Sequence, residues 1–103
     1  MSATVRNSLR ADREAEKASR WWRKHRPSTA TLFDHELRAA AVAIAESPGT
    51  PRVILEIDGS AIRRVSLPKT GYHVYYAWDG ADVVLIVAIW HARRGRGPFK
   101  KRR

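Results

Sequence analysis

Two β-prone runs that follow each other near the end of the chain constrain its fold most strongly. Residues 72–78 read YHVYYAW and residues 83–90 read VVLIVAIW, and Asp79-Gly80 lies between them. This dipeptide predicts a tight β-hairpin, because both central residues of a primed turn need a positive φ. Even-numbered residues of the first run share one face of a strand and odd-numbered residues the other. The second run is apolar on both faces, which is typical of a central strand.

The upstream segments predict further strands. Residues 3–7 have the composition of a short first strand. Residues 53–57 and 61–67 are separated by Asp58-Gly59 and predict a second hairpin.

Two amphipathic helices are expected between the first strand and these hairpins. The first begins after the N-cap residue Ser8 and ends at His25-Arg26-Pro27, because a residue before proline avoids the α region. The second is capped by Ser28 or Thr29 and runs to about Glu46. The expected fold class is therefore α+β, with an N-terminal helical hairpin packed on an antiparallel β-sheet of three to five strands.

The length and composition indicate one domain. Of the 103 residues, we assign 1–98 to a single domain and 99–103 to a basic C-terminal tail. No cysteine is present, so nothing indicates an oxidising compartment. No N-terminal stretch resembles a signal peptide, and the longest apolar run is too short to span a bilayer. We expect a cytoplasmic protein with no membrane partner.

The positive charge is concentrated in the second half of the chain. The formal net charge is +10; residues 1–50 hold 9 basic and 6 acidic side chains, and residues 51–103 hold 11 and 4. Residues 93–103 alone hold 7 basic side chains and no acidic one. Such a field favours binding to nucleic acid or to an acidic protein. The alternative for residues 100–103 is a solubilising or disordered tail.

Several side chains are candidates for a binding or catalytic site. Arg63 and Arg64 are adjacent on a strand and point to opposite faces. Either both are ordinary surface arginines, or one of them joins Arg93 and Arg94 in a basic pocket on the open sheet face. His91 follows the last strand and is either a general base or a cap of the strand end. The strand aromatics are core residues or, beside arginines, a base-stacking surface.

Other classes of site are excluded or not expected. The four histidines have no metal-ligand spacing, and we expect neither a metal site nor a cofactor. The chain has no phosphate-binding glycine loop in a strand–loop–helix context, no Gly-x-Ser-x-Gly elbow and no carboxylate pair placed for acid–base work.

A series of short motifs resembles a known family of toxins. In chain order they are Trp21-Trp22 with Arg26-Pro27, Phe33-x-x-Glu36-Leu37, Ile62-Arg63-Arg64-Val65, Gly71-Tyr72-His73-Val74-Tyr75-Tyr76, and Val87-Ala88-Ile89-Trp90-His91 with Arg93-Arg94-Gly95. Their order resembles the RelE/ParE superfamily of type II toxin–antitoxin systems over residues 3–98. One branch of this family cuts mRNA on the ribosome, and the ParE-like branch poisons DNA gyrase.

The resemblance implies where the nuclease residues of the family would lie. A gapless alignment places them at Arg64, Ser66, His73, Arg93 and Phe99. Ser66 stands in place of a lysine, His73 in place of an arginine and Phe99 in place of a tyrosine, which weakens a basic catalytic cluster. These departures favour the ParE-like branch, in which a histidine followed shortly by arginine after the last strand is common.

The resemblance also implies partners and site residues. If the chain is an enzyme, it is an mRNA endoribonuclease that uses Arg64, His73, His91 and Arg93. The residues expected to bind a target or an antitoxin are Arg63, Arg64, Tyr75, His91, Arg93, Arg94 and Arg96. The expected partners are an acidic cognate antitoxin and DNA gyrase, with the ribosome and mRNA as the alternative. A third alternative is a decayed, non-toxic relative or a plain nucleic-acid-binding module.

Overall fold

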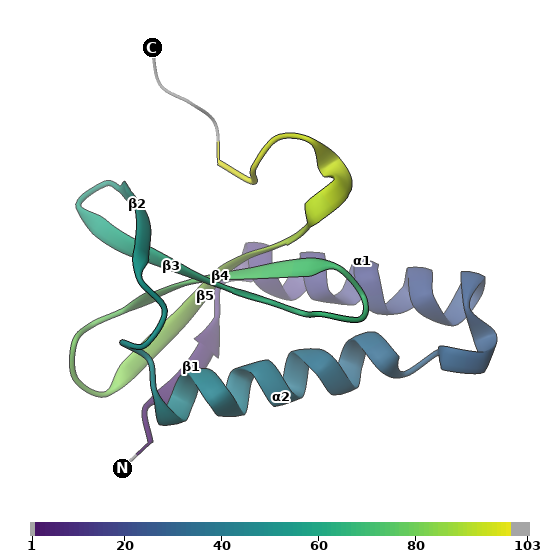
Figure 1. Ribbon diagram of the computed structural model, residues 1–103, viewed down its shortest axis with the longest axis horizontal. Coiled ribbons are helices and arrows are strands. Elements are labelled where there is room, and N and C mark those ends of the chain that lie inside the picture. The colour runs from purple at the N-terminus through teal and green to yellow at the C-terminus, as the bar shows by residue number, and fades with distance from the viewer. Residues whose placement is uncertain (1, 100–103) are drawn as a thin grey trace.

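The computed structural model describes residues 2–99, which form two helices against one face of a five-stranded sheet (Figure 1). This arrangement confirms the α+β fold class. No helix in the described range is long and apolar enough to cross a membrane. In chain order the elements are β1 Thr4–Asn7, α1 Leu9–His25, the 3-10 turn η1 Pro27–Thr29, α2 Leu32–Glu46, β2 Val53–Ile57, β3 Ser60–Ser66, β4 Tyr72–Trp78, β5 Val83–His91 and the 3-10 turn η2 Ala92–Arg94.

The start of α1 agrees with its prediction, but the start of α2 does not. The Ser8 hydroxyl accepts a hydrogen bond from the Ala11 N–H at 3.0 Å, as an N-cap should. The prediction that Ser28 or Thr29 caps α2 was wrong. Both residues belong to η1, in which the Thr29 N–H donates to the Arg26 carbonyl. Because Pro27 opens this extra turn, α2 begins only after Thr31.

Both predicted hairpins form, but with different turns. Asp58 and Gly59 have φ values of 49° and 83°, which are the two positive values of a tight primed turn. Between β4 and β5 only Gly80 has a positive φ. There the Asp79 carboxylate accepts from the N–H groups of Ala81 and Val83 and holds a longer loop of residues 79–82. The expectation of a tight turn at Asp79-Gly80 was therefore wrong.

Strand β1 makes the sheet mixed. The strand order is β1-β5-β4-β3-β2, and the four later strands are antiparallel, as expected. Strand β1 pairs in parallel with β5, with Thr4 opposite Val83 and Asn7 opposite Ile86. Nearly the whole chain separates these two strands, so no hairpin fixes their relative direction. This pairing places β5 inside the sheet, as its apolar sequence predicted.

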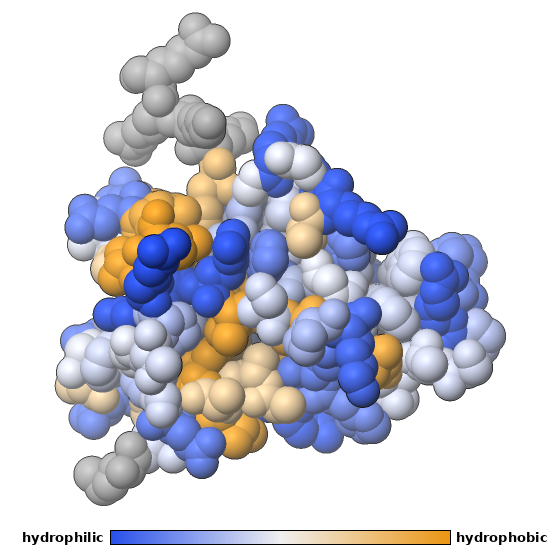
Figure 2. Space-filling view, in the orientation of Figure 1, coloured by the Kyte–Doolittle hydropathy of each residue, from blue (hydrophilic) through white to orange (hydrophobic). Residues whose placement is uncertain are grey.

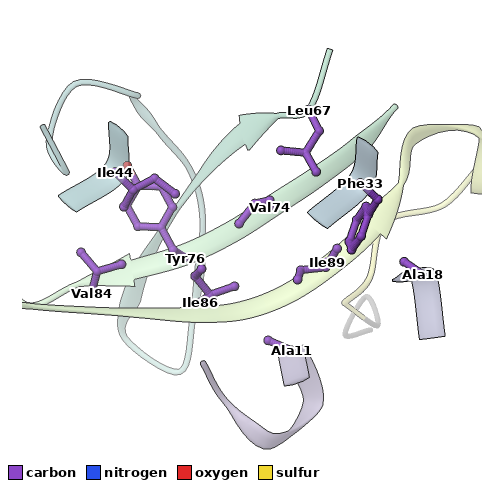
Figure 3. Close-up of a cluster of buried hydrophobic side chains, with 10 residues drawn as sticks. All are labelled: Ala11, Ala18, Phe33, Ile44, Leu67, Val74, Tyr76, Val84, Ile86 and Ile89. Carbon is purple, nitrogen blue, oxygen red and sulfur yellow. The ribbon is translucent and has the colours of Figure 1, made fainter. Parts of the chain in front are cut away.

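The main core lies between the helices and the sheet. It includes Phe33, Val74 and Tyr76, none of which is exposed to solvent (Figure 3). The hydroxyl of Tyr76 donates to the Pro48 carbonyl at 2.7 Å, so its polar atom is satisfied inside the core. The even-numbered residues of β4 share one face, as predicted, and the structure shows that this face is the one toward the helices. The odd-numbered residues of β4 therefore lie on the opposite, open face of the sheet, which no helix covers.

Candidate functional site on the open face of the sheet

The open face of the sheet carries a second, smaller apolar cluster. Ile62, Tyr75 and Ala88 are buried there, and Trp90 and Phe99 pack against them. Each lies on a β-strand except Phe99, which comes from the C-terminal segment. Aromatic side chains thus close over the centre of a sheet face that would otherwise be exposed to water.

The β3–β4 register places polar residues beside this cluster. Arg64 pairs with Tyr75, and Ser66 pairs with His73. Alternation along a strand therefore puts Arg64, Ser66 and His73 on the open face together with the Tyr75 ring. The structure thus brings together two residues predicted for the nuclease alternative, Arg64 and His73.

An irregularity in β5 decides which side its last residues face. Tyr75 pairs with Ala88 and Tyr76 with Ile86, so Val87 is an extra residue, as in a β-bulge. The bulge reverses the alternation, because Ile86 and Ile89 both lie in the main core although they are three residues apart. Trp90 consequently packs on the open face. His91 lies on the helix side, edge-on to Tyr72 with ring centroids 4.8 Å apart.

His73 is hydrogen-bonded to Ser66, and its surroundings favour the neutral form of the imidazole. Its Nδ1 lies 2.9 Å from the Ser66 hydroxyl. Burial lowers the pKa of His73 below its usual value, and the positive charge of Arg64 and an electrostatic interaction with His91 lower it further. An unperturbed histidine titrates near pH 6.5, so a lowered pKa leaves this imidazole uncharged at pH 7.

His91 acts as a structural cap. Its Nδ1 accepts from the Arg93 N–H at 3.1 Å, and its Nε2 lies 3.1 Å from the Thr70 carbonyl. Both ring nitrogens are therefore engaged by the backbone, which matches the alternative of a strand-end cap. A Cβ at Gly71 would lie 3.1 Å from Nε2, so a glycine there leaves room for the ring. A part for His91 in catalysis or target binding stays a prediction.

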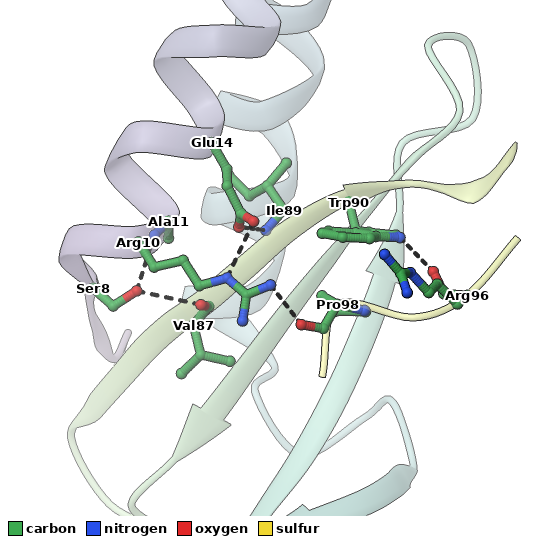
Figure 4. Close-up of polar contacts among 9 residues, drawn as sticks. All are labelled: Ser8, Arg10, Ala11, Glu14, Val87, Ile89, Trp90, Arg96 and Pro98. Carbon is green, nitrogen blue, oxygen red and sulfur yellow. Dashed lines mark hydrogen bonds and ion pairs between the residues drawn. The ribbon is translucent and has the colours of Figure 1, made fainter. Parts of the chain in front are cut away.

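The C-terminal segment, residues 92–99, folds back over the open face (Figure 4). The Arg94 guanidinium lies 3.8 Å from the centre of the Trp90 ring, close enough for a cation–π interaction. The Trp90 indole N–H donates to the Arg96 carbonyl at 2.6 Å. Phe99 meets Tyr75 edge-on at 5.5 Å between ring centroids. The predicted basic tail beyond residue 99 lies outside the described residues.

Arg10 of α1 holds this segment from the other side. Its Nη2 donates to the Pro98 carbonyl at 2.6 Å, and its guanidinium lies 5.5 Å from the Phe99 ring. Glu14 binds the Arg10 Nε at 3.1 Å and also accepts from the Ile89 N–H (Figure 4). Sequence reasoning missed Arg10 and Glu14, because their spacing reads as an ordinary surface pair of a helix.

Two other predicted site residues are not free on the open face. Arg63 points to the opposite face, where its guanidinium lies over the Trp78 ring and donates to the carbonyls of Gly49 and Pro51. It is therefore separated from the other predicted arginines. Tyr75 is only 5% exposed beneath Phe99. Their roles in binding a partner stay predictions.

The remaining predicted arginines are exposed. Arg93, Arg94 and Arg96 all lie on the surface of the C-terminal segment. Figure 2 shows strongly hydrophilic side chains over this part of the molecule. Within the described range, no acidic side chain forms an ion pair with any of the three. The segment thus presents unneutralised positive charge at the end of the sheet.

Comparison with known proteins identifies the family. A family model described as the ParE toxin of the type II toxin–antitoxin system parDE matches residues 5–96. The chain belongs to this toxin family. The resemblance to the RelE/ParE superfamily is therefore confirmed. No curated protein sequence matches this toxin significantly.

Two solved structures share the fold of the toxin. The isolated E. coli RelE toxin matches with a TM-score of 0.59 and 22% identity, over 92% of this chain and 89% of RelE. A mutant of E. coli RelE in complex with an antitoxin RelBc peptide matches with a TM-score of 0.58 and 22% identity, over 90% of this chain and 86% of that one. At this identity the likeness shows the fold and does not distinguish gyrase from the ribosome as the target.

Proposed function

We propose that this toxin inhibits growth by binding and poisoning DNA gyrase. The observation that carries the proposal is the exposed C-terminal segment, in which Arg93, Arg94 and Arg96 have no acidic partner among the described residues. Such a cluster steers association with a negatively charged macromolecule. Because gyrase acts on the chromosome, this function requires the toxin to work in the cytoplasm.

The chemistry of the open face also supports binding over catalysis. Phe99 packs its ring against Tyr75 and has no hydroxyl to offer a substrate. Ser66 and His73 supply an uncharged pair where the resemblance implies two cations in the nucleases. A face with fewer cations stabilises less negative charge in a transition state.

We further propose that an acidic antitoxin neutralises the toxin. A cleft of about 260 Å³ opens between α1 and the end of β5, beside the C-terminal segment, and its lining includes Glu14, Lys17, Trp21, Tyr72, His91 and Arg94. The Glu14 carboxylate is already bound by Arg10 and by the Ile89 N–H. Two cations next to aromatic rings suit an apolar side chain flanked by carboxylates. The RelE mutant that binds an antitoxin peptide has the same fold.

A second candidate function is ribosome-dependent cleavage of mRNA. The observation that favours it is the placement of Arg64 and His73 on one face, close enough for the charge of Arg64 to lower the pKa of His73. In this function Arg64 and Arg93 contact phosphate, and His73 or His91 takes part in proton transfer.

Brief induction in cells distinguishes the two functions. DNA breaks and filamentation are expected for gyrase poisoning, whereas rapid loss of translation with cleaved mRNA supports the nuclease. Arg93→Ala is expected to abolish growth arrest under both. Arg38→Ala, which removes an exposed cation from α2, is the matched control and should arrest growth normally.

Two outcomes would contradict these assignments. Toxicity that persists in a folded Arg93→Ala protein would show that the C-terminal segment is not the contact surface. Intact mRNA cleavage in both His73→Ala and His91→Ala would remove the proposed proton-transfer role.

A further inference from the structure

Ser66 and His73 are hydrogen-bonded to each other on the open face. Among the described residues, no other two polar side chains on this face form such a bond. The two residues face each other across the β3–β4 ladder, at a separation of 2.9 Å between Oγ and Nδ1. No second hydrogen bond of the Ser66 hydroxyl is present within residues 2–99. The position of the hydroxyl proton and the tautomer of the imidazole are therefore linked.

We propose that Ser66 is a positioning residue for His73. Its hydroxyl donates to Nδ1 and keeps the proton of the neutral imidazole on Nε2, so that His73 presents an N–H donor beside Arg64. This inference adds detail to the second candidate function, cleavage of mRNA. The hydrogen-bond arrangement itself does not depend on that function, but its use in binding RNA does. The anionic group that would meet the two donors is a phosphate of the RNA backbone.

The direction of the hydrogen bond follows from the donors and acceptors available. A serine hydroxyl has one proton, and Nδ1 is the acceptor that lies within reach of it. In the reverse arrangement the Nδ1 proton would bond to Ser66, and the exposed hydroxyl proton would bond to water and not to the protein. Free neutral histidine also prefers the proton on Nε2. Both considerations favour donation by Ser66.

The surroundings of His73 keep the ring neutral, which the proposal requires. The two charged or titratable groups that act on it are Arg64 from β3 and His91 from β5. Its partial burial opposes protonation of His73, and so do the positive charge of Arg64 and the electrostatic interaction with His91. At neutral pH one ring nitrogen must therefore be without a proton, and Ser66 determines which one.

This arrangement replaces the proton-transfer role that the second candidate function gave to His73 or His91. With Nδ1 accepting from Ser66 and Nε2 protonated, the ring has no free lone pair with which to act as a base. His91 is in the same position, because its Nδ1 accepts from the Arg93 N–H. His73 and Arg64 instead form a pair of donors that can stabilise negative charge.

Nitrogen NMR of the full chain tests the tautomer directly. With 15N-labelled protein above the pKa of His73, long-range proton–nitrogen spectra should show a protonated Nε2 and an unprotonated Nδ1. Ser66→Thr keeps the hydroxyl and should preserve this pattern. Ser66→Val has nearly the same shape without the hydroxyl and should give a mixture of tautomers, while the exposed His35 stays unchanged in all variants.

Titration with inorganic phosphate tests the donor role. Phosphate at neutral pH should shift the His73 resonances in the native chain and shift them much less in Arg64→Ala. A protonated Nδ1 in the native chain, or identical spectra for Ser66→Thr and Ser66→Val, would overturn the proposal, and no response to phosphate would overturn the donor role. These measurements do not depend on toxicity. Cells that show DNA breaks but no mRNA cleavage would therefore refute the nuclease function without deciding the role of Ser66.

Discussion

Replacing Glu36 with alanine should destabilise the toxin by about 2 kcal/mol. The Glu36 carboxylate, on α2, accepts three hydrogen bonds from the turn between β3 and β4: from the Lys69 N–H at 2.8 Å, and from the Thr70 N–H and hydroxyl at 2.8 and 2.7 Å. A hydrogen bond to a charged group contributes about 1.5–3 kcal/mol. Because the carboxylate is only partly buried and water replaces some of these contacts, we discount the sum to about 2 kcal/mol.

Urea unfolding followed by circular dichroism measures this loss. For a domain of this size, about 2 kcal/mol corresponds to a fall in Tm of about 8–16 °C. Glu46→Ala is the matched control, because Glu46 lies on the same helix, is exposed and, among the described residues, forms no hydrogen bond or ion pair with the turn. It should change stability by less than about 0.5 kcal/mol. Equal stabilities of the two variants would refute the reasoning.

The effect should also depend on pH. Burial of the Glu36 carboxylate opposes its ionisation, but hydrogen bonds from Lys69 and Thr70 outweigh burial and lower its pKa. A lowered folded-state pKa stabilises the protein above the unfolded-state value of about 4.3, and this contribution is lost as the pH falls through the folded pKa. The stability gap between the native chain and Glu36→Ala should therefore narrow in acid. A constant gap between about pH 7 and pH 3 would contradict the assigned cause.

Two further substitutions test how the site is held. Arg10→Ala should loosen the C-terminal segment and speed tryptic cleavage within it by about tenfold, because the lost contact with the Pro98 carbonyl is worth about 1.5 kcal/mol. Arg13→Ala, on the same helix, should leave the cleavage rate unchanged. Equal cleavage rates in the two variants would mean that Arg10 does not hold the segment. Gly71→Ala should cost more stability than Gly80→Ala. Both residues have a φ near +80°, but only the new Cβ at position 71 meets the His91 ring, so equal losses in urea unfolding would show that the ring gives way freely.

Local sequence patterns were enough to predict most elements of the fold. The alternation in residues 72–78 predicted which side chains share a face of the strand, and the Ser8 cap predicted the start of α1. The start of α2 was mispredicted, because an extra turn after Pro27 competes with capping by the next hydroxyl. The turn at Asp79 was also mispredicted, because its carboxylate binds the loop N–H groups and favours a longer loop.

The candidate site was predicted less completely than the fold. The resemblance named Arg64 and His73 as nuclease positions, but only the β3–β4 register showed that the two residues share the open face. The sequence did not indicate that Trp90 faces the open side and His91 the helix side, because one extra residue in β5 reverses the alternation. Nor did it indicate that Arg10 reaches Pro98, 88 positions away in the sequence.

The amino-acid sequence by itself determined the strands, the helices, the excess of positive charge and the family of this toxin, because each depends on neighbouring residues or on composition. The tertiary structure alone decided the parallel pairing of β1 with β5, the bulge that separates Trp90 from His91, and the folding of the C-terminal segment over the open face. These features depend on contacts between distant parts of the chain. Their energies come from packing and hydrogen bonds that exist only after the sheet and helices have assembled.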